Sequence, residues 1–399
     1  MPIDHSRLLP IAERHYRSFC DDLEILTNID CGSYDAAGVN LVAQWVTERL
    51  ERQGLDSERI VSESIVGGRY DGTPIGDSVV GRLRGDDASG ARILLMAHMD
   101  TVFEPGEPQR RPFSVDGQIA RGPGVCDDKA GLLTGLYALV VLAEIEYRDF
   151  AEIILHCSPD EEIGSPASRQ VIESLAAGVD AAICLECARA NGDLVSARKG
   201  IADLQIQIRG RAAHAGIEPE KGINAAVEAA HLIIALQALN GRWPTATCNV
   251  GLLRGGSRPN IVCDLVELEV DLRCANTAGF SAAYAQIERL CEQPTVPGIE
   301  VQLRSTAEHV PWERNAGTAD LVSKAKHVGE SVGVVVHEAA TGGAADANTT
   351  AALGIPTIDG LGPVGGDDHA PTEWLDLSTV AGRVALLAGL LTEIERSRP

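Results

Sequence analysis

The sequence predicts an α/β fold built on a mostly parallel sheet flanked by helices, with a second, α+β domain inserted into it. Short apolar runs such as "RILLMAH" and "EIILHC" alternate with helix-length segments. These runs are apolar on both faces, which is typical of parallel strands covered by helices on both sides. Between about residues 200 and 310 the order of elements changes to βαββαβ, which matches a ferredoxin-like unit.

The larger domain begins with two helices, which the spacing of apolar residues predicts over 4–28 and 38–54. Strands "RILLMAH", "EIILHC" and "AAICLE" follow, separated by helices over 128–147 and 165–177. After about residue 311 the alternation resumes with a helix over 318–333, strand "VGVVVHE", a helix over 344–353, strand "IPTID" and a helix from 377. The larger domain therefore comprises 1–198 and 311–399, and 199–310 is the inserted domain.

The inserted domain carries four strands, "ADLQIQIRG", "CNVGLLRGG", "IVCDLVELEVDLR" and "IEVQLRS", with helices over 223–240 and 279–292. A four-stranded sheet with helices on one face leaves edges that a two-fold related copy can cover. We therefore expect a homodimer that is joined through this domain.

Composition excludes several classes of partner. A formal charge of −23, from 34 basic and 57 acidic residues, repels nucleic acid and anionic membrane lipids. The start of the chain lacks the pattern of a secretory signal, and no run of eighteen apolar residues occurs, so we expect a cytoplasmic protein. Ten cysteines without a repeating spacing predict free thiols, and "CLEC" is interpreted as part of a strand in spite of its C-x-x-C spacing.

Potential metal ligands gather where predicted strands end. His98 and Asp100 lie two apart, so a carboxylate can hold one imidazole nitrogen while the other faces a metal. Asp127 and Asp128 follow a glycine-rich turn and open a helix, where a carboxylate either caps the helix or bridges two cations. These patterns predict a polar site at the carboxyl ends of the strands.

Further carboxylates and a second histidine complete the predicted site. Glu161 and Glu162 lie at a strand-to-helix turn, where one can coordinate a cation while its neighbour takes a proton. Glu186 ends the next strand, and His369 lies in a glycine-flanked loop. An acidic cluster after a strand is also typical of a helix start. Two histidines with three carboxylates favour zinc, with cobalt or manganese possible.

Five segments, "HMD", "GPGVCDDK", "DEEIGS", "CLEC" and "DDHA", occur in the order found in the di-zinc aminoacylase and glutamate carboxypeptidase family. The chain resembles this family over nearly its whole length. The resemblance implies a zinc-peptidase-like catalytic domain with two zinc ions, one on His98, Asp127 and Glu186 and the other on Asp127, Glu162 and His369. Asp127 would bridge the two ions.

The same resemblance implies roles for neighbouring residues. Asp100 would orient His98, and Glu161 would be the general base of the reaction. It also implies a cis peptide between Asp127 and Asp128 and a dimerisation role for the inserted domain.

The implied reaction is cleavage of the amide bond of small peptides or N-acyl amino acids that bear a free carboxylate, as in the glutamate carboxypeptidases. The alternative is an N-acyl amino-acid deacylase of the acetylornithine deacetylase or succinyl-diaminopimelate desuccinylase type, because "ARKG" at 197–200 resembles those branches. A metal-free binding protein with this fold is a third possibility, but such a protein should lack a ligand or the base, and this chain has all of them.

Candidate substrate contacts lie mostly in the inserted domain. His214 in "GRAAHAG" matches the family's histidine that reaches the partner's active site, and Asn260 and Arg273 match positions near the substrate. Arginine suits bidentate binding of a carboxylate, although a strand arginine also pairs with neighbouring acids. "TGGAAD" at 341–346 resembles the family's carboxylate-binding loop, with Ala344 in place of its third glycine.

Overall fold

The computed structural model describes residues 3–66 and 71–396. Its central sheet is mixed but mostly parallel, as the sequence predicts: β6, β3, β7 and β14 are parallel neighbours, and β2 and β1 add an antiparallel edge. In spatial order the strands are β1 (Asp56–Ile60), β2 (Ser78–Arg84), β6 (Glu152–Ser158), β3 (Arg92–His98), β7 (Ala181–Cys184) and β14 (Thr357–Ile358).

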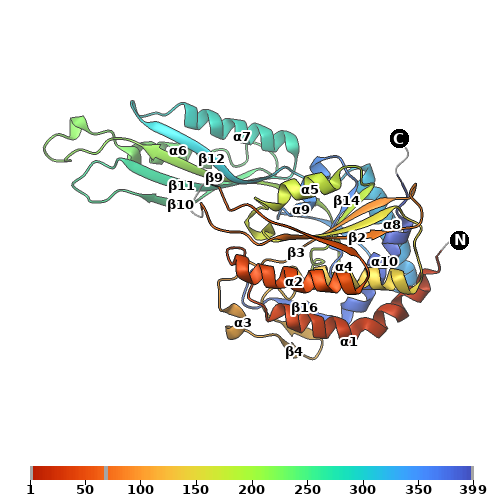
Figure 1. The fold of residues 1–399 in the computed structure, drawn as a ribbon. Coiled ribbons are helices and arrows are strands. Elements are labelled where there is room, and N and C mark those ends of the chain that lie inside the picture. Colours follow the sequence, from red (N-terminus) through yellow and green to blue (C-terminus); the bar gives the residue numbers. More distant parts are fainter. Residues whose placement is uncertain (1–2, 67–70, 397–399) are drawn as a thin grey trace.

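Helices cover both faces of this sheet (Figure 1). Alternate residues of β3 show why its run is apolar throughout: Ile93 and Leu95 pack into one core, and Leu94 and Met96 pack into the other. The larger core takes in α1 (Leu8–Thr27), α2 (Ala36–Arg52), α4 (Lys129–Glu144), α8 (Ala316–Val332) and α10 (Val380–Glu393), and the smaller takes in α5 (Ser168–Ala176) and α9 (Asp346–Ala352).

A second, fully antiparallel sheet projects from this body (Figure 1). Its order β10-β11-β9-β12 and the chain order βαββαβ are those of a ferredoxin-like unit. Alternate residues of β9, such as Leu204 and Ile206, enter a separate apolar core, while Asp203 and Gln205 lie on the opposite face. The elements are β9 (Gly200–Arg209), α6 (Ala225–Gln237), β10 (Thr247–Gly255), β11 (Leu265–Cys274), α7 (Thr277–Glu292) and β12 (Glu300–His309).

The chain leaves the main body for the small sheet and returns from it at one place. Arg198 and Trp312 exchange two backbone hydrogen bonds, each with an N···O distance of 3.0 Å. Arg198 ends β8 (Leu194–Arg198), and Trp312 is buried. The outgoing and returning connections are therefore joined to each other before the small sheet begins.

The structure differs from the sequence prediction in two strands. The predicted strand "VGVVVHE" is wrong, because α8 continues to Val332 and Gly333, at φ 74°, ends it; the strand β13 spans Glu338–Thr341. The strand β7 ends at Cys184, so Glu186 lies beyond the strand rather than in it. The sequence analysis also omitted the strands β1, β2 and β8. Shorter elements that it omitted are α3 (Glu107–Arg110), β4 (Ser114–Asp116), β5 (Ile119–Arg121), β15 (Gly365–Gly366) and β16 (Trp374–Asp376).

All ten cysteines are free thiols, as predicted. Within 3–66 and 71–396, no helix combines the length and the apolar character that crossing a bilayer requires.

Candidate metal centre

The predicted ligands converge because three neighbouring parallel strands end together. The strand β3 lies between β6 and β7, so His98 at its end stands between the segments that follow the other two strands. Those segments carry Glu161 and Glu186, and Asp127 lies just before α4, which packs against β3. This is the edge of an α/β sheet where ligands ordinarily bind.

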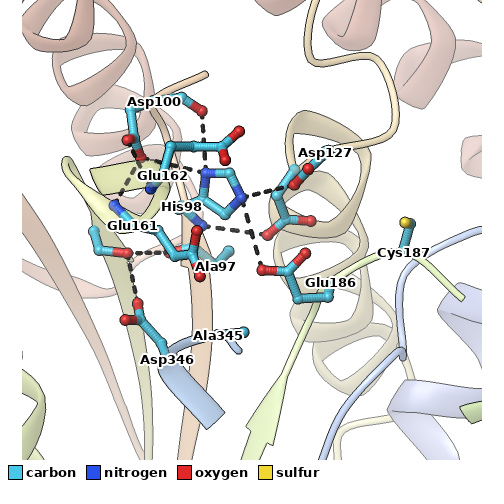
Figure 2. Close-up of polar contacts among 12 residues, drawn as sticks. Ala97, His98, Asp100, Asp127, Glu161, Glu162, Glu186, Cys187, Ala345 and Asp346 are labelled. Carbon is cyan, nitrogen blue, oxygen red and sulfur yellow. Dashed lines mark hydrogen bonds and ion pairs between the residues drawn. The ribbon is translucent and has the colours of Figure 1, made fainter. Parts of the chain in front are cut away.

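His98 is the centre of the cluster, and its two ring nitrogens face different groups (Figure 2). Its Nε2 atom lies 2.9 Å from Asp127 Oδ1 and 3.7 Å from Glu186 Oε1. Its Nδ1 atom lies 3.3 Å from Asp100 Oδ1 and 3.0 Å from the Asp100 backbone oxygen. One nitrogen is thus held by Asp100 while the other is directed at the carboxylates, the arrangement expected of a metal-ligating histidine.

Asp100 holds more than the imidazole ring. Its fully buried carboxylate accepts a hydrogen bond from the Ser33 hydroxyl at 2.7 Å and from the backbone N–H groups of Glu161 and Glu162, each at 3.2 Å. Sequence reasoning assigned Asp100 to His98 alone. The structure shows that one carboxylate fixes both the histidine and the acidic turn.

The acidic turn is a short 3-10 helix over Glu161–Ile163. The Glu162 Oε2 atom lies 3.0 Å from His369 Nε2, which in turn lies 3.2 Å from Asp127 Oδ2. Asp127 therefore presents one carboxylate oxygen to His98 and the other to His369. A carboxylate oxygen of Glu161 lies within 4.8 Å of ligand atoms of His98 and Glu186.

The pKa values of the acidic residues and of His369 in this site are consistent with a bound cation. Burial and the charge of Asp127 raise the pKa of Glu186 to about 8 and that of Glu162 to about 7. Burial and Glu186 raise the pKa of Glu161, and hydrogen bonds to Asp127 and Glu162 raise the pKa of His369 to about 11. Crowded buried carboxylates of this kind are stabilised by a divalent ion, and a donor set of imidazole nitrogens and carboxylate oxygens suits zinc.

The turn that carries Asp127 is fixed from two sides. The Asp127–Asp128 peptide is cis, as predicted, and Asp128 Oδ2 accepts the His98 N–H at 3.2 Å. Gly131 cannot carry a side chain, because a Cβ atom there would lie 1.9 Å from both Asp128 Oδ1 and the Leu185 backbone oxygen. Close packing of α4 against the site therefore requires glycine at this position.

The sequence analysis gave no role to two buried acids near the site. Glu373 accepts the backbone N–H groups of Gly124, Cys126 and Asp127 at 2.9 to 3.1 Å. Asp346 accepts the hydroxyls of Ser158 and Ser165, which flank the acidic turn. Asp346 lies in "TGGAAD", so the family motif marked it, whereas Glu373 is a single acid in a loop with no local signal.

A cleft of about 1010 Å³ separates this site from the small sheet. Glu161, Glu162 and His369 line one side of the cleft, and Arg273 and Arg304 are among the residues on the other. The structure thus brings the predicted Arg273 to the site. Its guanidinium pairs with Asp271 at 2.9 Å and donates to the Gly342 backbone oxygen at 3.1 Å, so the pairing with a neighbouring acid also occurs.

The structure does not bring His214 and Asn260 to this cleft. They are neighbours of each other, since Ala215 N–H donates to the Asn260 backbone oxygen at 3.0 Å, and both are exposed. The loop between β9 and α6 that carries His214, green in Figure 1, lies at the far end of the small sheet. A role for either residue in its own subunit's site is therefore excluded by position in this conformation.

Ligand-type residues gathered beside a large cleft are the arrangement expected of an enzyme that uses bound metal ions. The chain belongs to the peptidase family M20/M25/M40, whose sequence model matches residues 94–393. The resemblance drawn from the five motifs is thus confirmed at the level of the family. Members of this family hydrolyse amide bonds with metal ions, and this chain is accordingly an amide-bond hydrolase.

Individual relatives span several substrate classes. The chain is 33% identical to carboxypeptidase G2 of Pseudomonas sp. (strain RS-16) over 378 residues, 93% of this chain and 88% of that protein. It is 30% identical to acetylornithine deacetylase of Edwardsiella ictaluri over 207 residues, 47% of this chain and 51% of that protein. The fold is shared with a tripeptidase from Staphylococcus aureus, with a TM-score of 0.74, 20% identity and coverage of 95% of this chain and 98% of that one.

Proposed function

We propose that the protein is a two-zinc hydrolase that acts as a carboxypeptidase on small peptides or N-acyl amino acids with a free carboxylate. The observation that carries this proposal is the position of Asp127, whose two oxygens face different histidines. One zinc ion is assigned to His98, Asp127 and Glu186, and the other to Asp127, Glu162 and His369. Cobalt or manganese can substitute in such a donor set.

The bound ions supply Lewis-acid polarisation of the amide carbonyl and a lower pKa for the attacking water. Glu161 serves as the general base. Its backbone N–H is held by Asp100, and its carboxylate lies against His98 and Glu186 without a hydrogen-bonded partner of its own among the described residues. This position allows the carboxylate to take a proton from water and return it to the leaving amine.

Substitution of Glu161 by glutamine tests this assignment. The variant should keep its two equivalents of zinc and lose turnover by about 10²- to 10⁴-fold, because the base is removed without loss of a ligand. Glu162→Gln is the matched control, since it should lose metal as well as activity. Turnover retained in Glu161→Gln would show that the base is another residue, and binding of only one zinc ion in excess metal would exclude the bridging role of Asp127.

The substrate class rests on Arg273 and on the identity to carboxypeptidase G2. A guanidinium on the far wall of the cleft can bind a carboxylate while the amide lies at the metals. The deacylase alternative is favoured by "ARKG" and by the similarity to acetylornithine deacetylase. A panel of dipeptides, N-acyl glutamates, N-acetylornithine and N-succinyl-diaminopimelate separates the two, since the higher kcat/KM identifies the class.

We further infer that 199–310 forms a dimerisation domain and that His214 completes the active site of the opposite subunit. Exposed apolar side chains on α6 and on the edge strand β10 support a homodimer; they are Val227, Ile234, Leu252 and Leu253. We also propose a cytoplasmic location, because all ten cysteines are free thiols.

Complementation between two inactive variants tests the role of His214. Glu161→Ala and His214→Ala should each be nearly inactive as homodimers. Random pairing on co-expression makes about half of the dimers mixed, each with one intact site of two, so activity should recover to about a quarter of wild type. No recovery, with mixed dimers confirmed by mass, would show that His214 does not act across the interface.

A further inference from the structure

A second group of potential metal ligands lies beside the candidate metal centre. It consists of Cys126, Cys187 and Asp368, each of which is next in sequence to a residue of that centre. The two sulfur atoms and a carboxylate oxygen of this group all lie within 4.8 Å of one another. Figure 2 shows the sulfur of Cys187 apart from the oxygen atoms that surround His98. The two groups therefore offer different donor atoms: this group includes two sulfur atoms, whereas the candidate metal centre offers only nitrogen and oxygen.

The geometry of this second group fits a tetrahedral ion. With Zn–S of about 2.3 Å and Zn–O of about 2.1 Å, a tetrahedral angle places sulfur and oxygen about 3.6 Å apart. The Cys187 Sγ to Asp368 Oδ1 distance is 3.6 Å. Both cysteines are buried, and Asp368 is partly exposed. Two sulfur ligands favour a thiophilic ion such as zinc over magnesium or calcium.

Two arginine side chains lie near the sulfur atoms. Arg189 Nη2 lies 3.9 Å from Cys187 Sγ, and the buried Arg383 lies within electrostatic reach of the same residue. Within the described parts of the chain, Arg189 Nε and Arg383 Nη1 are buried without a hydrogen-bond partner. Nearby cations stabilise the thiolate, which is the form of cysteine that binds metals. Each of these two guanidinium groups thus keeps one buried nitrogen, without a partner among the described residues, close to the thiol pair.

We propose that Cys126, Cys187 and Asp368 form a third cation site, which takes a thiophilic divalent ion of the zinc class. This ion ties together three segments that are remote in sequence and that each also carry a ligand of the candidate metal centre. The site is separate from the proposed function, since its donors include sulfur and the candidate metal centre offers only nitrogen and oxygen.

Cobalt is the probe that tests this site. The reduced full-length chain, already carrying two equivalents of Zn²⁺, is titrated with Co²⁺, and the near-ultraviolet thiolate-to-cobalt charge-transfer band is followed. The band should saturate with one equivalent bound at sulfur, disappear in Cys126→Ala and Cys187→Ala, and persist in Cys248→Ala, a buried thiol in the small sheet. Absence of the band in wild type, or its persistence in both site variants, would overturn the proposal.

A measurement without substitutions covers the case in which a variant fails to fold. Alkylation of wild-type Cys126 and Cys187 is compared by peptide mass spectrometry, with two equivalents of Zn²⁺ and with a third. The third equivalent should slow modification of both cysteines at least tenfold, and equal rates would show only a hydrogen-bonded thiol pair. Loss of turnover has no bearing on either readout, so a failure of the proposed hydrolase mechanism is distinguishable from a failure here.

Discussion

Replacing His156 by leucine should make the protein more resistant to acid. His156 lies in the middle of β6, paired with Val80 and Met96, and it is fully buried with no hydrogen-bond partner for either ring nitrogen among the described residues. Burial lowers its pKa from 6.5 to about 4. The folded state therefore holds the neutral ring, whereas the unfolded chain takes up a proton near pH 6.5. Stability is fully present above that pH and is lost as the pH falls toward 4.

The magnitude follows from the two pKa values. A difference of about 2.5 units corresponds to about 3 kcal/mol of unfolding free energy once the pH is below 4. At pH 5 the loss is about 2 kcal/mol, and at pH 7.5 it is close to zero. Leucine removes this loss, and it also removes two unpaired buried nitrogens, whose burial costs about 1–3 kcal/mol each. Both effects stabilise the variant at pH 5, but only the first depends on pH.

Urea unfolding at pH 7.5 and pH 5 measures both effects. Metal-free protein is used for wild type and for His156→Leu, so that loss of metal ions does not enter the comparison. His309, whose pKa burial and Arg169 lower to about 3, contributes equally to both proteins and cancels. His231→Leu, an exposed histidine on α6, is the control and should leave the pH dependence unchanged. An identical change in stability between pH 7.5 and pH 5 in His156→Leu and wild type would refute the reasoning.

Three further outcomes are expected. Glu373→Gln should weaken metal binding by about 10- to 100-fold in a chelator competition, because the turn that carries Asp127 loses its charged acceptor. Unchanged affinity would show that this turn is held in place without the Glu373 carboxylate. Arg198→Met should lower the free energy of unfolding in urea by about 3–5 kcal/mol, because the buried Asp359 is left unpaired. Adding Asp359→Leu should restore most of that stability, and a double variant no more stable than Arg198→Met would contradict this. Relative to the metal-loaded protein, metal-free protein should lose stability as the pH rises from about 5 through 8, because Glu162 and Glu186, with raised pKa values of about 7 and 8, must ionise while crowded. His156 and His309 contribute equally to both forms and cancel in this comparison, so a difference in thermal stability, measured in parallel melts, that does not change with pH would contradict the prediction.

The ligand-bearing segments were predictable because each depends on local sequence. His98 follows a strand that is apolar on both faces, and the acidic turn follows another, so the parallel sheet alone brings them together. The cis peptide at Asp127 and the family assignment came from motif resemblance rather than from periodicity. The assignments of zinc, of Glu161 as base and of His214 as a residue acting across subunits stay predictions.

What the sequence missed depends on contacts between distant segments. Glu373 accepts hydrogen bonds from the N–H groups of residues that precede it by about 250 positions. No local sequence pattern predicts such a contact. The run "VGVVVHE" is rich in β-branched residues, which favours a strand, but α8 continues into it, Gly333 ends that helix, and the strand begins only at Glu338. The end of α8 at Gly333 thus displaced the strand from the β-branched run.

The paired connections at Arg198 and Trp312 are one of the links between the two walls of the cleft. Two segments of the chain run side by side there and are hydrogen-bonded to each other, and Arg273 Nη1 adds a further link by donating to the Gly342 backbone oxygen. Arg273 and Arg304 belong to the small sheet, whereas Glu161 and His369 belong to the main body. The distance between the wall that carries the two arginines and the candidate metal centre therefore depends on how these links hold the two domains together.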